Sequence, residues 1–297
     1  MTVGIAGPRR WTIAALAMVV VAGCAGAASG PRWRTTTAEA PIGRTLRVDG
    51  VRREYSVLLP RERHGRPPLV VVLHLLGGSD DALAPTTPPA RAAWAKGAIV
   101  ASPSGIGFSW NAGSCCGQAR RRSVDDVGFL RALVADVVRR DGADPGRVSA
   151  VGFSNGGMMA LRAACEGMPL SNVVVVEGAL LVDSCRLHGP TDLLMIHQTG
   201  DRIVPYGGAV APPIAGLIGP LPPAPQSFDR WRRAARCAES RQVTSGPVTT
   251  LTSDCPRHTD ARLLVMVGGR HQWPRRPRDR VDADRLVLAT FGLGRTR

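Results

Sequence analysis

Three side chains that cooperate in nucleophilic catalysis occur in the order serine, aspartate, histidine. Ser154 is the centre of a Gly-x-Ser-x-Gly motif, Asp201 follows Gln-Thr-Gly, and His271 lies in Gly-Gly-Arg-His-Gln-Trp-Pro. A serine hydroxyl becomes a nucleophile when a histidine accepts its proton and a carboxylate orients that histidine. These residues in this order predict acyl transfer through an acyl-enzyme on Ser154, with His271 as the base and Asp201 as the orienting acid.

Each of the three residues follows an apolar run of strand length, at 148–153, 193–196 and 263–267. A sharp turn from a strand into a helix would lift the Ser154 hydroxyl out of a sheet. Asp183 follows another apolar run, which ends near Val176, and is the alternative acid. His74 and His197 lie at strand ends, where a structural hydrogen bond is the expected role.

Backbone N–H groups that stabilise a developing oxyanion are expected in two places. The first is the loop His74-Leu75-Leu76-Gly77-Gly78-Ser79, which follows the apolar run 69–73. The second is the residue after the nucleophile, at the start of the helix. We therefore expect the N–H groups of Leu76 and Asn155 to form the oxyanion hole.

The elements that position these residues indicate the α/β class. Unbroken apolar runs at 69–73, 98–101, 148–153, 173–176, 193–196 and 263–267 are typical of strands buried on both faces. Helical spacing predicts a helix over 124–140, with Ser123 and Asp126 as its capping box. Asp49-Gly50 predicts a hairpin turn, and the Pro- and Gly-rich stretch 211–227 predicts a long loop. The sequence thus predicts a mostly parallel sheet with helices on both faces.

Several ordered motifs between about residues 45 and 275 resemble those of the polyhydroxybutyrate depolymerase and feruloyl esterase family. They are Trp110-Asn111-Ala112-Gly113, Cys115-Cys116-Gly117, Asp125-Asp126-Val127-Gly128-Phe129, Gly152-Phe153-Ser154-Asn155-Gly156-Gly157-Met158-Met159 and Gly269-Arg270-His271-Gln272-Trp273-Pro274. The resemblance implies the α/β-hydrolase fold and hydrolysis of a carboxylic ester. It also implies that Ser154, Asp201 and His271 are the triad, and that Cys237 pairs with Cys255.

The sequence departs from the family pattern at two positions. Leu75 stands where glycine usually follows the oxyanion-loop histidine, and Arg270 stands where glycine often precedes the catalytic histidine. If the loop requires positive φ at Leu75, the leucine is strained, and Leu75→Gly should raise kcat. The alternative is that Leu75 has an ordinary backbone conformation and shapes the acyl pocket.

The N-terminal segment is typical of an export signal. Arg9 and Arg10 precede an apolar run from Trp11 to Ala22 that is too short for a confident bilayer span. Val-Ala-Gly-Cys at residues 21–24 resembles a bacterial lipobox, which predicts lipidation of Cys24. We therefore expect a signal peptide over 1–23, a lipidated N-terminus and linker over 24–42, and a catalytic domain over 43–297. The protein is expected to be exported, anchored to the extracellular face of the cell membrane or secreted.

Six cysteines remain beyond Cys24, and an even number in an oxidising compartment suggests three disulfides. A zinc site is disfavoured because no Cys-x-x-Cys pair has a matching second half. Residue types alone permit 15 pairings. The partners of Cys115, Cys116, Cys165 and Cys185 therefore stay open.

Composition and charge limit the partners. The formal net charge is +15 and comes almost entirely from arginine, since Lys96 is the only lysine. No nucleic-acid motif accompanies these arginines, so a solvated surface is the favoured interpretation. We expect no metal and no organic cofactor; the oligomeric state is not predicted. Trp110 and Trp273 could line a substrate pocket or pack in the core.

The expected partner is an ester substrate, which a polymer could supply. Two other functions are compatible with the sequence. The first is acyl transfer to a sugar or lipid hydroxyl by the same triad. The second is a non-catalytic envelope lipoprotein that binds a polymer.

Overall fold

The computed structural model describes residues 40–62, 65–78, 88–210 and 214–294. The predicted signal peptide and the lipidation site Cys24 lie outside these residues, so both stay predictions. Within the described ranges, no helix is both long enough and apolar enough to cross a membrane.

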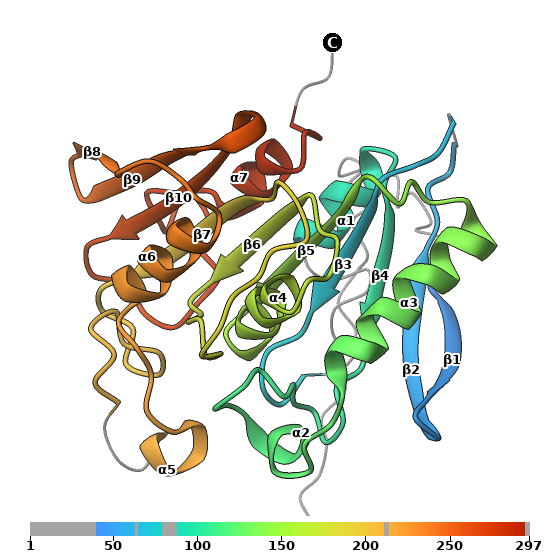
Figure 1. Ribbon diagram of the computed structural model, residues 1–297. Helices are drawn as coiled ribbons and strands as arrows, with labels where there is room; N and C mark the ends of the chain where they lie inside the picture. Colours follow the sequence, from blue (N-terminus) through green and yellow to red (C-terminus); the bar gives the residue numbers. More distant parts are fainter. Residues whose placement is uncertain (1–39, 63–64, 79–87, 211–213, 295–297) are drawn as a thin grey trace, which may run out of the picture. The chain divides into compact units, whose positions relative to one another are not determined.

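One mixed sheet organises the described residues (Figure 1). Its ten strands lie in the order β1-β2-β4-β3-β5-β6-β7-β10-β9-β8. The six central strands from β4 to β10 are parallel, and the strands at both edges are antiparallel. The strands are β1 (Ile42–Val48), β2 (Val51–Leu58), β3 (Leu69–Leu73), β4 (Ile99–Pro103), β5 (Val148–Phe153), β6 (Asn172–Val176), β7 (Asp192–Gln198), β8 (Arg241–Ser245), β9 (Val248–Cys255) and β10 (Thr259–Met266).

Helices cover both faces of the sheet (Figure 1). On one face, α4 packs on β3, β5 and β6, with α3 beside it and α6 on β10. On the other face, α1 packs on β3 and β4, and α7 packs on β6 and β7. The helices are α1 (Pro88–Ala95), α2 (Gly117–Arg121), α3 (Asp126–Asp141), α4 (Asn155–Cys165), α5 (Ile214–Ile218), α6 (Ala224–Ala234), α7 (Ala283–Thr290) and the short 3-10 helix η1 (Pro256–His258).

The apolar runs form strands that are buried on both faces, as the sequence predicts. In β6, Val173 and Val175 pack in the core beneath α3, α4 and α6, while Val174 and Val176 pack in the core beneath α1 and α7. Full burial of one such side chain contributes roughly 1.5–3 kcal/mol to stability. The predicted mostly parallel α/β sheet is confirmed.

Two local predictions were wrong, and two strands were not predicted. The N-cap of α3 is Asp125, whose carboxylate accepts a hydrogen bond from the Gly128 N–H. Ser123 has a φ of 48° two residues earlier, so it cannot form the predicted capping box. The stretch 211–227 is not one loop, because it contains α5 and the first turn of α6. Strands β8 and β9 escaped the sequence analysis because they do not form a continuous apolar run, and every residue of β8 is exposed.

The six cysteines of the described region form three disulfides. Cys237 pairs with Cys255, and this link joins the segment after α6 to the last residue of β9. The pairs that the residue types left open are Cys165–Cys185 and the adjacent Cys115–Cys116.

Candidate active site

The residues predicted to do chemistry gather at the carboxyl edge of the parallel strands. Ser154 follows β5, Asp201 follows β7, His271 follows β10, and Leu76 follows β3. The carboxyl ends of parallel strands share one edge, where ligand sites of open α/β sheets are found. The strand order places β5, β6, β7 and β10 side by side, which brings the three catalytic candidates to neighbouring positions.

Ser154 occupies a strained turn between β5 and α4. Its φ is 55° and its ψ is −125°, a conformation that costs a non-glycine residue roughly 1–3 kcal/mol. Two glycines make the turn possible, because a Cβ at Gly152 would lie 2.2 Å from the Gly156 carbonyl carbon, and one at Gly156 would lie 2.2 Å from the Leu73 carbonyl oxygen. The Ser154 N–H donates to the Val176 carbonyl at 2.8 Å, which ties the turn to β6.

Asp201 and His271 form a direct pair. Nδ1 of His271 lies 2.7 Å from Oδ2 of Asp201, while Oδ1 of Asp201 accepts hydrogen bonds from the N–H groups of Ile203 and Val204. The carboxylate is therefore fixed from both sides. With Nδ1 engaged, Nε2 is the ring nitrogen that remains to accept a proton.

The His271 ring lies close to the nucleophile. It stacks on Phe153, the residue before Ser154, with 4.7 Å between ring centroids. Ser154 and His271 are not hydrogen bonded to each other. Catalytic contacts of this kind often tighten only when substrate is bound, so the arrangement is compatible with proton transfer between them.

The alternative acid and the other histidines have different positions. Asp183 is exposed and lines an open cleft with residues of α2 and α4, whereas Asp201 contacts His271. His74 accepts from the Gly105 N–H through Nε2 and contacts the Leu75 carbonyl through Nδ1. Nε2 of His197 lies 2.8 Å from the Val204 carbonyl. The structural roles predicted for His74 and His197 are confirmed.

The loop after β3 and the start of α4 offer the predicted oxyanion donors. The Gly77 and Gly78 N–H groups donate to the carbonyls of Phe108 and Leu75, but that of Leu76 donates to none of the described residues. Asn155 is the first residue of α4, where N–H groups have no partner within the helix.

The side chain of Asn155 fixes the backbone around this donor. Its Oδ1 accepts from the Trp110 N–H at 2.8 Å, and its Nδ2 donates to the Trp110 carbonyl at 3.0 Å. The loop that carries Trp110 is held in turn by buried Asp126, which accepts from the Asn111 N–H and pairs with Arg53. The side chains of Asn155 and Asp126 therefore hold the backbone of the Trp110 loop in place against the start of α4.

The strain hypothesis for Leu75 is wrong. Leu75 is not among the described residues with positive φ, and the turn is made by Gly77, whose φ is 86°. The Leu75 side chain is 38% exposed, so it can contact a ligand without distorting the loop. Leu75→Gly therefore has no strain to relieve.

The two tryptophans have different environments. Trp110 is fully buried, and its indole N–H donates to the His74 carbonyl at 2.9 Å, so it packs in the core rather than lining an open pocket. Trp273 is partly buried, lies edge-on to Phe153 and donates to Asp284. Of the two, only Trp273 is available to line a pocket beside His271.

Glu177 is a site residue that the sequence analysis missed. It follows β6 with a φ of 52° and is fully buried, and its carboxyl lies beside that of Asp201. One ligand atom from each of Glu177, Asp201 and His271 lies within 4.8 Å of the others. The sequence feature that could have identified Glu177 is a glutamate directly after four consecutive valines. It lies at the carboxyl end of β6, the strand next to the one that precedes the nucleophile.

The pKa values of the two carboxyl groups are shifted in opposite directions. Burial raises the pKa of Glu177 far above its ordinary value, and the hydrogen-bonded Asp201 raises it further. Burial also tends to raise the pKa of Asp201, but its hydrogen bonds with His271 and Glu177 outweigh this effect and hold it below the ordinary value. The two shifts favour a proton on Glu177 and a negative charge on Asp201.

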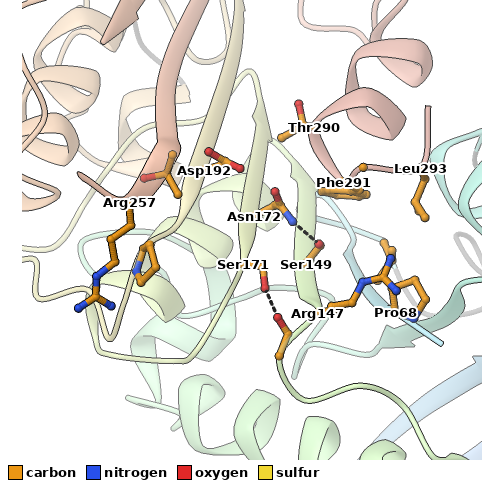
Figure 2. Close-up of a pocket in the computed structure, with 15 residues that line it drawn as sticks. Pro68, Arg147, Ser149, Ser171, Asn172, Asp192, Arg257, Thr290, Phe291 and Leu293 are labelled. Atoms are coloured by element: carbon orange, nitrogen blue, oxygen red, sulfur yellow. Dashed lines mark hydrogen bonds between the residues drawn. The ribbon is translucent and has the colours of Figure 1, made fainter. Parts of the chain in front are cut away.

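A cavity of about 360 Å³ lies at the opposite edge of the sheet (Figure 2). Pro68, Arg147, Ser171 and Asp192, at the amino ends of β3, β5, β6 and β7, contribute to its lining. None of the catalytic candidates lines it. The chemistry is therefore assigned to the carboxyl edge and not to this cavity.

Comparisons with known proteins identify the family and the fold. The chain matches no protein-family model. It is 32% identical over 260 residues to the putative esterase NocK of Nocardia uniformis subsp. tsuyamanensis, an alignment that covers 81% of this chain and 74% of that protein. It is 29% identical over 218 residues to feruloyl esterase B of Piromyces equi, covering 69% of this chain but only 39% of that protein. Among solved structures, it is similar to acetyl xylan esterase from Aspergillus awamori, with a TM-score of 0.60, 14% identity and coverage of 85% of this chain and 99% of that chain.

Proposed function

Because this chain belongs to the esterases of the α/β-hydrolase fold, we propose that it hydrolyses carboxylic esters through an acyl-enzyme on Ser154. The observation that carries the proposal is the Asp201–His271 pair, whose ring stacks beside the strained turn of Ser154. A histidine oriented by a carboxylate next to a serine at a strand-to-helix turn is the arrangement that acyl transfer requires.

In the proposed reaction, Ser154 Oγ attacks the ester carbonyl carbon while His271 Nε2 takes the hydroxyl proton. Asp201 holds the ring through Nδ1 and stabilises the imidazolium. The N–H groups of Leu76 and Asn155 donate to the oxyanion of the tetrahedral intermediate. His271 returns the proton to the leaving alcohol, and a water molecule activated by the same histidine then releases the acid.

We propose acyl groups of polyhydroxyalkanoates, or feruloyl and acetyl groups on carbohydrate polymers, as substrates. The named activities of the feruloyl and acetyl xylan esterases to which the chain is similar support ester-linked groups on polymers. Exposed Leu75 and partly buried Trp273 are the side chains available to contact such a group.

We also propose that the protein works outside the cytoplasm, held by a lipid on Cys24. The three disulfides support this location, because disulfides persist in oxidising compartments. The lipobox-like residues 21–24 support the anchor.

Rapid-mixing kinetics with a nitrophenyl ester tests the proposed function. An acyl-enzyme predicts a burst of nitrophenol about equal to the enzyme concentration when deacylation is slower than acylation. Ser154→Ala should abolish both burst and turnover. Turnover that appears only with an alcohol acceptor would identify a transferase, and no reaction with any ester would favour a binding protein.

A further inference from the structure

Glu177 is not part of the proposed triad, yet it lies beside the triad's acid in the interior of the protein. The Oε1 atom of Glu177 accepts hydrogen bonds from the backbone N–H and the side-chain amide of Gln198, both at 3.0 Å. The Gln198 N–H also reaches Oε2 at 3.3 Å, and Nε2 of His197 lies 3.4 Å from the same oxygen. One oxygen of Glu177 lies within 4.8 Å of an oxygen of Asp201, and both residues are buried. Two carboxyl groups this close can form a hydrogen bond only if one of them carries a proton, because two carboxylates have none to share.

Titratable groups reach Glu177 from two directions. His197 lies in β7, Asp201 lies in the loop after β7, and His271 lies in the loop after β10. Burial lowers the pKa of His197, and its Nε2 is directed at the Val204 carbonyl, so His197 supplies no positive charge that would favour an ionised glutamate. A second carboxylate here would leave two negative charges facing one histidine in a buried site, which is costly.

We propose that Glu177 is a positioning residue that keeps its proton and donates it in a hydrogen bond to Asp201. This inference rests on the proposed function, since Asp201 matters only as the acid of the triad. Asp201 already has His271 on Oδ2 and the Ile203 and Val204 N–H groups on Oδ1, and the Glu177 proton adds one further donor. The donor fixes the carboxylate in the orientation that the histidine needs.

Two variants of similar length separate a donor from a packing side chain. Glu177→Gln keeps an N–H donor and cannot ionise, while Glu177→Met fills the space and cannot donate. Hydrogen bonds to charged groups are strong enough that loss of one should lower kcat about tenfold to a hundredfold in Glu177→Met, with little change in KM. Glu177→Gln should recover most of that kcat.

The pH dependence of stability provides a readout that does not require activity. In the folded protein, Glu177 keeps its proton at pH values where an unfolded glutamate has lost it. The stability that its proton supports is therefore fully present below the ordinary pKa of 4.5 and declines as pH rises. The Tm of Glu177→Gln should thus rise relative to that of the wild type between pH 4.5 and 9. Asp201, His197 and His271 are present in both proteins.

The experiment measures kcat, KM and Tm for wild type, Glu177→Gln and Glu177→Met from pH 4.5 to 9, with nitrophenyl acetate as substrate. Equal kcat in the two variants, or a Tm difference between wild type and Glu177→Gln that does not change with pH, would overturn the proposal. An inactive wild type with the expected Tm trend would instead refute the esterase function and leave the protonated pair intact.

Discussion

The close packing of the nucleophile turn against β3 makes Gly156→Ala an informative perturbation. A Cβ at this position would lie 2.2 Å from the Leu73 carbonyl oxygen and 2.5 Å from that of His74. Ordinary contact begins near 3.4 Å, so backbone must move by about 1 Å. The strand that moves leads into the oxyanion loop. Because a 1 Å misplacement can cost about 100-fold in rate, kcat should fall by roughly that factor while KM changes little.

The same clash should reduce stability by roughly 1–3 kcal/mol, as overpacking of a filled interior usually does. Steady-state kinetics with nitrophenyl acetate and a melting curve measure the two effects. Gly189→Ala is the matched control, because a Cβ there has nothing within 4 Å and the residue has no positive φ. If Gly156→Ala has the kcat and Tm of the control, packing at this turn does not position the oxyanion donors, and that part of the reasoning fails.

Three further predictions concern the acid, a disulfide and the anchor. In Asp201→Asn, the amide oxygen should keep the hydrogen bonds from the Ile203 and Val204 N–H groups, so the NH₂ group faces His271 Nδ1. Nδ1 must then accept a hydrogen bond, which places the histidine proton on Nε2, where it blocks removal of the serine proton. We expect kcat to fall about 10⁴-fold, whereas Asp183→Asn should leave it unchanged; equal effects would remove Asp201 from the mechanism. Replacing Cys237 and Cys255 with alanine opens a link of sequence separation 18 and should cost roughly 3 kcal/mol in urea unfolding; an unchanged midpoint would contradict this value. Cys24→Ala should abolish incorporation of a labelled fatty acid in a lipoprotein-processing bacterium; equal labelling of both proteins would exclude Cys24 as the lipidation site.

Local sequence patterns predicted most of the fold and the placement of the candidate residues, for a physical reason. Strands buried on both faces must be apolar throughout, so β3, β5, β6 and β7 were visible as unbroken runs. The order of residues along the chain then placed Ser154, Asp201 and His271 at one edge.

What the sequence analysis missed depends on contacts between distant segments. The role of Glu177 arises because β6 and β7 are neighbours, which brings its carboxyl to Asp201. The backbone conformation of Leu75 is ordinary because Gly77 makes the turn. The N-cap of α3 depends on which of the nearby polar residues Ser123 and Asp125 faces the first turn of the helix. Strand β9 is held by pairing with β10, and β8 by pairing with β9, rather than by burial, so their composition contains little signal.

The central claim is that Ser154 is the nucleophile, and covalent labelling tests it most directly. The purified protein is treated with a fluorophosphonate, and the modified peptide is identified by mass spectrometry. We predict one adduct, on Ser154, that is absent in Ser154→Ala and forms much more slowly in His271→Ala, since His271 must accept the serine proton. An adduct on another residue, or ester hydrolysis by Ser154→Ala at the wild-type rate, would contradict the account.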